Sequence, residues 1–454
     1  MPRRGDGNAC HDSASPSGGR GAESLDCIGG ALGAVYERPR IRMPPDIPSS
    51  AIHPEVARTR DDMVALRRHL HAHPELGFEE FATSDLVAER LASWGYAVHR
   101  GLGGTGVVGQ LRLGEGPRRL GIRADMDALP IQETTGLPYA SRHAGKMHAC
   151  GHDGHTAILL AAAQCLARTR GFDGTLNLIF QPAEESLGGG RRMVEEGLFE
   201  QFPCDAVFAL HNMPGFPVGR LGFRSGHFMA SSDSVYLTVR GKGGHGSTPH
   251  LTQDPVVAAA HLVLALQTVV SRNVDPRDMA VVTVGAIHAG SAPNVIPDEV
   301  ELRLSVRAYR PEVRQALRER ITELARVQGE ALGVVVDVDY HWRYPALVNH
   351  DGPTRFAREV ARQVFGQEAL LDDLQPLTGS EDFSFLLEAC PGSYLIVGNG
   401  EGDHHATGGC SPHNPGYDFN DAALPVAATY WVNLAEQFLS SRYRSCLPWT
   451  EASA

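Results

Sequence analysis

The order of strand-like and helix-like segments limits the fold of this chain more than any other feature of its sequence. Apolar, β-rich runs predict strands, and an Ala- and Leu-rich run among them predicts a helix: strands at 107–113, 120–130, 175–180 and 206–210, and a helix at 156–168. Two helices are predicted ahead of these strands, over 56–70 and through Val87 and Leu91 to a stop at Gly95. Strands that alternate with helices indicate an α/β fold with a mostly parallel, helix-covered sheet.

The pattern changes between about Ser234 and Pro345, where the segments follow the order β-α-β-β-α-β. That order is the ferredoxin-like arrangement, which closes as a unit of its own and predicts an inserted α+β domain. The first pattern then resumes with a helix near 356–365, a strand at 393–398 and a final helix over 421–439. The predicted division is a flexible extension, two catalytic segments and one insert: 1–50, 51–230 with 346–445, and 231–345.

Composition narrows the class of partner. The chain has 454 residues, enough for two domains with separate cores, and a formal net charge of -12 with dispersed Lys and Arg. Such a chain is not expected to carry a broad nucleic-acid or anionic-membrane surface, and no run approaches the roughly 20 apolar residues of a membrane span. The eight cysteines are scattered and imply no disulfide framework. We therefore expect a soluble, cytoplasmic protein with a small-molecule substrate, and an N-terminal extension that is mobile or precedes a true start at Met43.

Carboxylates and a histidine follow three separate predicted strands. Asp125 and Asp127 come at the end of the second strand, Glu184 and Glu185 after the third, and His211 after the fourth. Open α/β sheets place ligands at the carboxyl ends of their strands. These side chains are therefore expected to gather at one edge of the sheet.

The run MHACGHDGH (147–155) adds a thiol and an imidazole, Cys150 and His152, separated by one residue. Thiolate, imidazole and carboxylate suit zinc, manganese or a similar divalent ion, and a pair of such ions can activate water and polarise a carbonyl together. The candidate ligands for two divalent ions (Zn²⁺ or Mn²⁺) are Cys150, His152, Glu185, His211 and His413. Taken singly, a buried cysteine is more often an inert small hydrophobe, and an isolated histidine more often a hydrogen-bonded structural group.

The neighbouring carboxylates Glu184 and Glu185 in QPAEE (181–185) are candidates for two different roles. They follow an apolar strand and lead into glycines, where a solvated pair of helical charges is not expected. If Glu185 binds metal, Glu184 is free to take a proton from water and return it to a leaving amine, as a general base does. Asp127 is a candidate to orient an imidazole ligand through the ring's other nitrogen.

Eight ordered segments between about 55 and 440 resemble the dinuclear metal-dependent aminoacylase and carboxypeptidase-like amidohydrolases, with the hippurate hydrolase and indole-acetyl-amino-acid hydrolase branch the most similar. The segments are RADMDALPI, MHACGHDGHTA, QPAEE, His211-Asn212, GKGGHGSTPH, APNVIPD, GSEDFS and HNPGYDFND. The resemblance implies an α/β catalytic domain with an inserted lid that usually forms the dimer contact. It also implies the five metal ligands above, with Glu184 as the base.

Three lid residues take roles only from this resemblance. His245 matches a histidine that in relatives reaches the partner subunit's site and helps to stabilise the oxyanion, which implies a homodimer or homotetramer. Asn294 and Arg307 match positions near the substrate carboxylate. Taken without the resemblance, Asn294 is a turn residue before Val295 and Pro297, and Arg307 a solvated strand position.

The sequence thus predicts a metal-dependent amidohydrolase that cleaves an N-acyl amino acid, of hippurate or N-acetyl type, with metal-activated water and Glu184 as general base. A dipeptidase or an N-acetyl-diaminopimelate deacetylase would use the same chemistry. A metal- or ligand-binding protein without turnover is the alternative of another class, although simple binding needs neither a free base nor an oxyanion donor.

Overall fold

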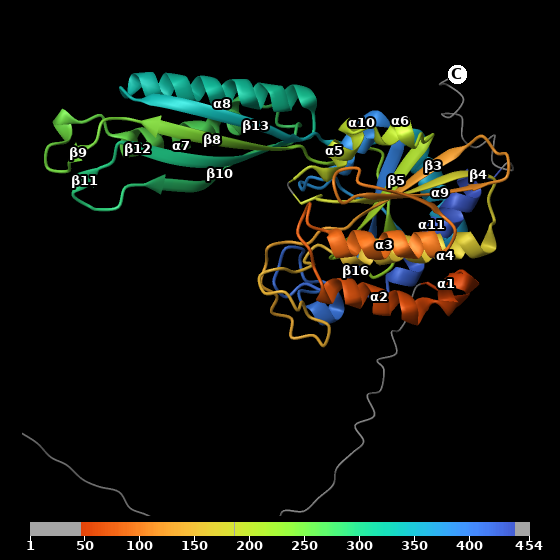
Figure 1. Ribbon diagram of the computed structural model, residues 1–454. Helices are drawn as coiled ribbons and strands as arrows, with labels where there is room; N and C mark the ends of the chain where they lie inside the picture. The colour runs from red at the N-terminus through yellow and green to blue at the C-terminus, as the bar shows by residue number, and fades with distance from the viewer. Residues whose placement is uncertain (1–46, 186, 441–454) are drawn as a thin grey trace, which may run out of the picture. The chain divides into compact units, whose positions relative to one another are not determined.

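The computed structural model describes residues 47–185 and 187–440. Most of the predicted extension over 1–50, including Met43, and the last residues of the segment 346–445 lie outside the described residues. The described elements form two large sheets, each with helices of its own, and two small two-stranded sheets (Figure 1).

The larger sheet has the strand order β1-β2-β4-β3-β5-β16-β6-β15 within the described residues. Parallel pairing joins β4, β3, β5 and β16 at its centre. On one side β2 and β1 pair antiparallel; on the other β6 pairs with β16 antiparallel and with β15 parallel. The mostly parallel sheet that the sequence predicts is therefore found, with antiparallel pairings towards its two edges. The strands are β1 (Ala97–Arg100), β2 (Val107–Leu113), β3 (Arg119–Asp125), β4 (Gly174–Gln181), β5 (Ala206–Pro214), β6 (Leu221–Gly222), β15 (Leu370–Leu371) and β16 (Gly392–Gly400).

Helices cover both faces of this sheet because its strand residues alternate between two cores. Phe208 belongs to the larger core, whereas its neighbour Val207 belongs to the core on the other face. The larger core includes α1 (Pro54–Arg58), α2 (Arg60–Ala72), α3 (Phe81–Ser93), α4 (His152–Thr169), α9 (Asp351–Phe365) and α11 (Leu424–Phe438). The smaller core includes α5 (Gly189–Glu195), α6 (Leu198–Gln201) and α10 (Phe383–Ala389), and we call the sheet with all these helices the central unit.

The second sheet, with strand order β10-β12-β8-β13, is antiparallel throughout. It shows the predicted β-α-β-β-α-β order and has a core of its own, in which α7 and α8 pack on one face. We call residues 232–344 the inserted unit. Its elements are β8 (Ser232–Arg240), β9 (Gly244–His245), η2 (Pro249–Leu251), α7 (Pro255–Asn273), β10 (Ala280–Ala289), β11 (Val295–Ile296), β12 (Glu299–Ala308), α8 (Pro311–Ala331) and β13 (Val335–Tyr344).

Short elements complete the description. The strands β7 and β14 pair antiparallel on the two chain segments that lead into and out of the inserted unit. The remaining elements are β7 (Gly226–Met229), β14 (Leu347–Asn349), η1 (Ser49–Ala51), η3 (Gln367–Ala369) and η4 (His405–Thr407).

Several predicted boundaries are wrong. Helix α4 begins at His152 rather than at 156, because Gly151 adopts the left-handed conformation that starts the helix there. Strand β3 ends at Asp125 rather than at 130, and the helix predicted over 56–70 is interrupted at Thr59. Strand β5 continues to Pro214, so that His211 lies inside a strand rather than after one.

Helix α7 is long and apolar enough to cross a membrane by length and composition alone, contrary to the sequence expectation. In this structure its buried residues, among them Leu262, Leu266 and Val269, belong to the core of the inserted unit. Core helices of folded domains pass the same test.

Candidate active site

The carboxyl ends of three parallel strands meet at one edge of the central sheet. Asp125, the last residue of β3, pairs in register with Gln181, the last residue of β4, and β5 runs parallel on the other side of β3. The loops that leave this edge carry Asp127 and Glu184. The convergence expected from the sequence therefore occurs.

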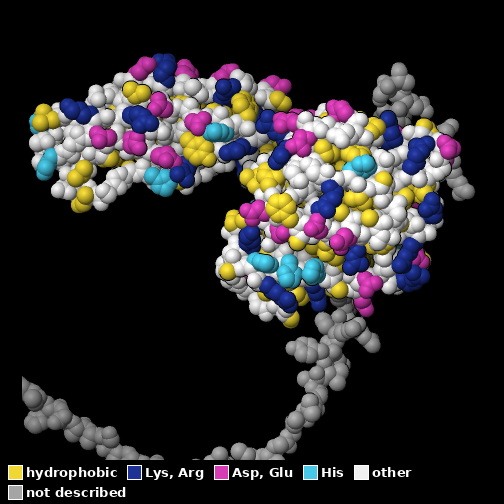
Figure 2. All heavy atoms as spheres, in the orientation of Figure 1, with side chains coloured by type: hydrophobic (Ala, Val, Ile, Leu, Met, Phe, Trp, Pro, Cys, Tyr) yellow, Lys and Arg dark blue, Asp and Glu magenta, His cyan; other side chains and the backbone are white. Residues whose placement is uncertain are grey.

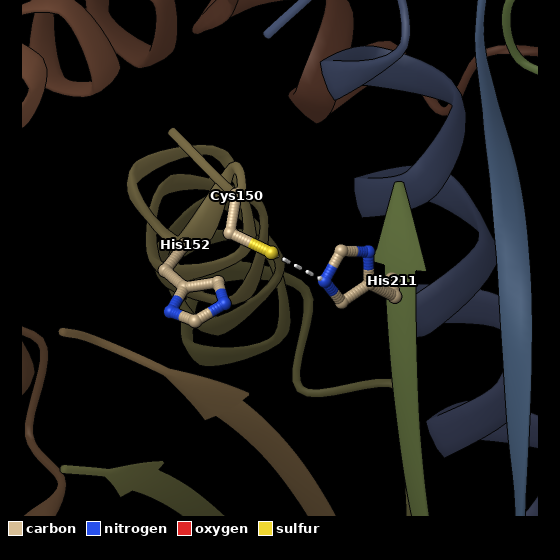
Figure 3. Close-up of side chains that lie close together, drawn as sticks. All are labelled: Cys150, His152 and His211. Atoms are coloured by element: carbon tan, nitrogen blue, oxygen red, sulfur yellow. Dashed lines mark hydrogen bonds between the residues drawn. The ribbon is translucent and has the colours of Figure 1, made fainter. Parts of the chain in front are cut away.

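Cys150, His152 and His211 form the first group at this edge. Their potential ligand atoms all lie within 4.8 Å of one another, and Cys150 Sγ lies 3.3 Å from His211 Nε2. Figure 3 shows the thiol pointing at the His211 ring, with His152 beside it at the start of α4. Gly151, between Cys150 and His152 in the sequence, has a φ of +97°, and a Cβ there would lie 2.2 Å from Asn212 Oδ1. Only glycine fits at this position.

Cys150, Glu185 and His413 form a second group with the same mutual spacing. His413 Nε2 lies 3.1 Å from Glu185 Oε1, and the His413 backbone N–H donates to the Ala149 carbonyl at 2.7 Å. That bond fixes a residue whose φ of +63° is unusual outside glycine. Contacts with Cys150 and then Glu185 raise the pKa of His413 to about 10. The five ligands predicted from the sequence therefore fall into two groups that share Cys150.

Two buried polar atoms indicate that a cation fits here. His152 Nε2 and Glu185 Oε1 are shielded from solvent and make no regular hydrogen bond, although buried polar atoms normally do; Asp125 Oδ2 lies 3.8 Å from the first and His413 Nε2 3.1 Å from the second. Both point into groups whose donors, a thiol, imidazoles and a carboxylate, are those that zinc and similar ions select. The residues present match a metal site.

Asp127 connects the two groups. Its Oδ1 lies 3.2 Å from His152 Nδ1, and its Oδ2 accepts a hydrogen bond from the Glu185 backbone N–H at 2.9 Å. A carboxylate on one ring nitrogen leaves the other free to bind an ion and fixes the orientation of the ring. Asp127 therefore contacts both the His152 ring and the Glu185 backbone.

Glu184 lies beside these groups with 7% of its surface exposed. Burial, followed by the charges of Glu381 and Glu185, raises its pKa well above the usual value. Its Oε1 accepts a long hydrogen bond, 3.4 Å, from the Asp382 backbone N–H. A carboxylate in this environment binds a proton more strongly than an exposed one, as a general base requires.

A cavity of about 420 Å³ opens onto the site. It is lined by four of the predicted ligands, by Glu184 and by Arg307, together with Met213, Met229, Tyr344 and Tyr394. Arg307 Nη1 lies 3.5 Å from the Thr378 carbonyl, and burial lowers the pKa of its guanidinium. No carboxylate in the described ranges lies within ion-pair distance of Arg307, which leaves its positive charge to the cavity.

His245 and Asn294 are not among the residues that line this cavity. The Gly246 backbone N–H donates to the Asn294 carbonyl at 2.8 Å, and His245 pairs with Val295, so the two predicted residues lie together at the small antiparallel sheet of β9 and β11. Strand β9 follows Arg240, which pairs with Val335 at the far end of β13 from Tyr344. The nine-residue strand β8 separates the two ends by roughly 27 Å. Asn294 therefore groups with His245 and not with Arg307.

Sequence reasoning missed a buried ion cluster behind Glu184. The Arg123 guanidinium contacts Asp125 at 2.6 Å, Glu381 at 2.9 Å and Asp382 at 3.0 Å. The segment GSEDFS, which contains Glu381 and Asp382, contributed only to the resemblance and received no role. A charged Arg in the middle of an apolar strand was the signal that could have found the cluster, since it needs buried partners.

A second buried cluster supports the first turn of α4. Arg67 contacts Asp418 at 2.8 Å and Asp421 at 2.7 Å, and Asp153 accepts from His71 at 2.8 Å. These partners are far apart in the sequence, so no local pattern could have paired them.

Comparisons with known proteins agree with this geometry. Residues 121–437 match the peptidase family M20/M25/M40. The chain is 45% identical over 386 residues to the hippurate hydrolase of Campylobacter jejuni, covering 85% of this chain and 99% of that protein. It is 40% identical to an IAA-amino acid hydrolase of Arabidopsis thaliana, covering 84% and 86% of the two chains. A dinuclear metal binding peptidase of the M20 family from Bacillus subtilis aligns with a TM-score of 0.71 and 33% identity, covering 84% and 99%.

Proposed function

Because this chain belongs to the peptidase family M20/M25/M40 and is a metal-dependent amidohydrolase, we propose that it cleaves the amide bond of N-acyl amino acids to a carboxylic acid and a free amino acid. The observation that carries the proposal is the pair of ligand groups sharing Cys150, with the buried Glu184 beside them in one cavity. Relatives named for hippurate and for IAA-amino acids support an aromatic acyl group.

We propose that the two groups would hold two divalent ions, zinc or manganese, through Cys150, His152, Glu185, His211 and His413. Bound there, such ions would supply a Lewis acid and lower the pKa of water. Glu184 takes a proton from the attacking water and passes it to the amide nitrogen, so that the leaving amine departs neutral. Asp127 keeps the His152 ring turned toward the ion and holds the Glu185 backbone.

The charge of Arg307 favours a substrate with a free carboxylate. Within the cavity lining, Arg307 is the cation that lacks an acidic partner, and Met213 and Met229 offer apolar surface nearby. An N-acyl amino acid presents both features, an anionic end and an apolar acyl group. A dipeptide also carries a carboxylate but brings a charged amine, which the thioether surface would not stabilise.

We propose that the protein works as a homodimer or homotetramer, in which the inserted unit, with boundaries near 231 and 345, serves as lid and contact. His245 and Asn294 lie roughly 27 Å along β8 from the end of the unit that meets the cavity, so that they would act in another subunit's site. Leu264 of α7 is 70% exposed, and β10 is an edge strand with exposed apolar residues such as Ile287. Apolar surface of this kind is typical of subunit interfaces.

We place the enzyme in the cytoplasm, with no nucleic-acid or membrane partner. All five cysteines in the described ranges are free, and free thiols persist in a reducing compartment.

The test combines a base variant with a substrate panel. Glu184→Gln keeps the shape of the side chain and should lower kcat by about 10²- to 10⁴-fold while the metal content of the purified protein stays at the wild-type value. The panel holds benzoyl, indole-acetyl and acetyl conjugates of several amino acids, the matching amides without a carboxylate, and dipeptides. An active Glu184→Gln variant would contradict the assigned base, and a preference for dipeptides would contradict the substrate class.

A further inference from the structure

The loop that carries Glu184 and Glu185 is held by hydrogen bonds to side chains of other segments. It joins β4 to α5, and Ala183 within it has a φ of +52°, which an L-residue rarely adopts. The Ala183 backbone N–H donates to Glu80 Oε1 at 2.8 Å, and the Glu185 backbone N–H donates to Asp127 Oδ2 at 2.9 Å. Side chains outside the loop therefore determine where the carboxylates lie.

Tyr344 makes the third attachment. Its hydroxyl donates to the Glu184 carbonyl at 2.6 Å and accepts from the Gly188 backbone N–H at 3.0 Å, so that one oxygen closes the loop at both ends. The phenol is 6% exposed, and its ring packs edge-on against Phe385 with centroids 5.9 Å apart. Burial, followed by the charges of Asp382 and Glu184, raises the pKa of Tyr344, which keeps the hydroxyl protonated as a donor.

Tyr344 also lies at the boundary of the inserted unit. Tyr344 is the last residue of β13 and pairs with Ser232, the first residue of β8. The two residues mark where the chain enters and leaves the inserted unit. The Tyr344 hydroxyl is thus a hydrogen-bonded contact between the frame of the inserted unit and the loop that bears the base.

We propose that Tyr344 is a positioning residue for the reaction: it holds the Glu184 backbone in place and links the position of that backbone to the position of the inserted unit. The inference rests on the proposed role of Glu184 as general base. Tyr344 belongs to neither of the ligand groups, so it acts through Glu184 and not through metal binding. Small displacements of a reacting group, on the order of 1 Å, lower rates by roughly 10²-fold.

The test is Tyr344→Phe, which removes one oxygen and keeps the ring. We expect kcat to fall about 10- to 100-fold with KM changed less than about threefold and with wild-type metal content. The matched control is Tyr340→Phe on the same strand, whose hydroxyl donates to Asp233 at 3.2 Å within the inserted unit. That variant should keep wild-type kcat, because its lost bond does not reach the loop.

A double-mutant cycle separates positioning from general loss of structure. Glu184→Asp withdraws the carboxylate by one methylene, so a further Tyr344→Phe change should cost severalfold less than it does in the wild type. Additive effects, or a kcat for Tyr344→Phe equal to that of Tyr340→Phe, would overturn the inference. Phe385→Leu removes the ring that packs against Tyr344 and leaves the Tyr344 hydroxyl in place, so it should lower kcat a few-fold. If Tyr344→Phe does not fold, this variant tests the positioning role instead. If Glu184→Gln is inactive while Tyr344→Phe is not impaired, only the positioning role is wrong, whereas an active Glu184→Gln would remove the base itself.

Discussion

The central unit and the inserted unit are held together in different ways. Behind the candidate site, the central unit buries whole ions, including Arg67 and Arg123 with their carboxylate partners. The inserted unit has a core of aliphatic side chains, with Asp233 as its buried carboxylate among the described residues. The central unit buries several such ion clusters, whereas the inserted unit buries one carboxylate, Asp233, which pairs with Arg314.

The difference in buried charge indicates which unit contributes to the chemistry and which to stability. Apolar residues of similar volume often stabilise a protein as well as a buried ion pair does, so ion clusters are weak evidence for stability. In this chain they surround the ligand groups and Glu184, where they fix donors and shift pKa values. We therefore expect changes in the central unit to act on chemistry and on pH dependence, and changes in the inserted unit to act on stability or assembly.

Metal removal should give the largest effect. Prolonged dialysis against a strong chelator is expected to reduce activity to background, because the ligand groups then hold no Lewis acid. Loss of ions present at 100- to 1,000-fold above their Kd should also cost about 3 to 4 kcal/mol of stability. Activity and thermal unfolding measured after adding back zinc or manganese would identify the ion. Full activity in chelated protein of verified zero metal content would contradict the site.

Removal of the Arg123 guanidinium should have the next largest effect. Arg123→Leu leaves Asp125, Glu381 and Asp382 buried without their cation, and we expect a loss of about 3 to 5 kcal/mol in the free energy of unfolding. The matched change in the other unit, Leu302→Ala, opens a cavity in an apolar core and should cost about 2 to 5 kcal/mol. Denaturant unfolding measures both.

The two variants differ in their pH dependence. The loss in Arg123→Leu should shrink at acidic pH, where the carboxylates take up protons, while the loss in Leu302→Ala should not change. Equal pH profiles would show that the contrast between charged and apolar cores has no energetic meaning here.

The sequence was a good guide where a pattern is local. Strand and helix order follows from apolar periodicity, and the side chains of Asp125, Glu184 and His211 converge because parallel strands end at one edge. It was a poor guide to contacts between distant segments. The pairing of Arg67 with Asp418 and the attachment of Tyr344 to Glu184 depend on how loops fold back, which no periodicity encodes.

Titration of His71 should produce a smaller effect with a definite sign. Burial lowers the pKa of His71, but hydrogen bonds to Asp153 and Glu133 outweigh it and raise the pKa to about 9. Since the folded pKa exceeds the unfolded value near 6.5, the contribution is complete below pH 6.5 and is lost as the pH rises through 9. It amounts to at most about 3 kcal/mol.

Unfolding free energies between about pH 6 and 10 check this expectation. His71→Gln should flatten the decline between pH 6.5 and 9 relative to wild type. His341→Gln, on a strand of the inserted unit, is the control and should leave the decline intact, because both side chains of the His341–Asp339 contact are exposed to solvent. An unchanged slope in His71→Gln would show that another group titrates.

Asp127→Asn tests the connection between the two ligand groups. An amide can still receive the Glu185 N–H, but it cannot offer a carboxylate to His152 Nδ1. Changes of this type lower metal affinity or activity about 10- to 100-fold. Metal titration of the chelated variant measures the affinity, and Asp233→Asn in the inserted unit, where Asp233 contacts Arg314, serves as the comparison. Wild-type affinity and kcat in Asp127→Asn would mean that the His152 ring is oriented by packing alone.

The smallest effect is expected on the surface of the inserted unit. Figure 2 shows acidic and basic side chains interspersed there, and Arg240 contacts Glu299 at 2.5 Å and Asp337 at 2.9 Å across neighbouring strands. All three side chains are more than half exposed, so that solvent screens the pairs, and Arg240→Ala should change the free energy of unfolding little, and less still at high salt. Its kcat should equal that of the wild type, since the guanidinium lies at the end of β8 away from Tyr344. Chemical unfolding at low and high salt, with kcat measured on the same samples, checks both statements. A large loss of kcat in Arg240→Ala without a change in stability would contradict the contrast between the units. A surface charge of the inserted unit would then take part in the chemistry, which would require that it contact the site of another subunit.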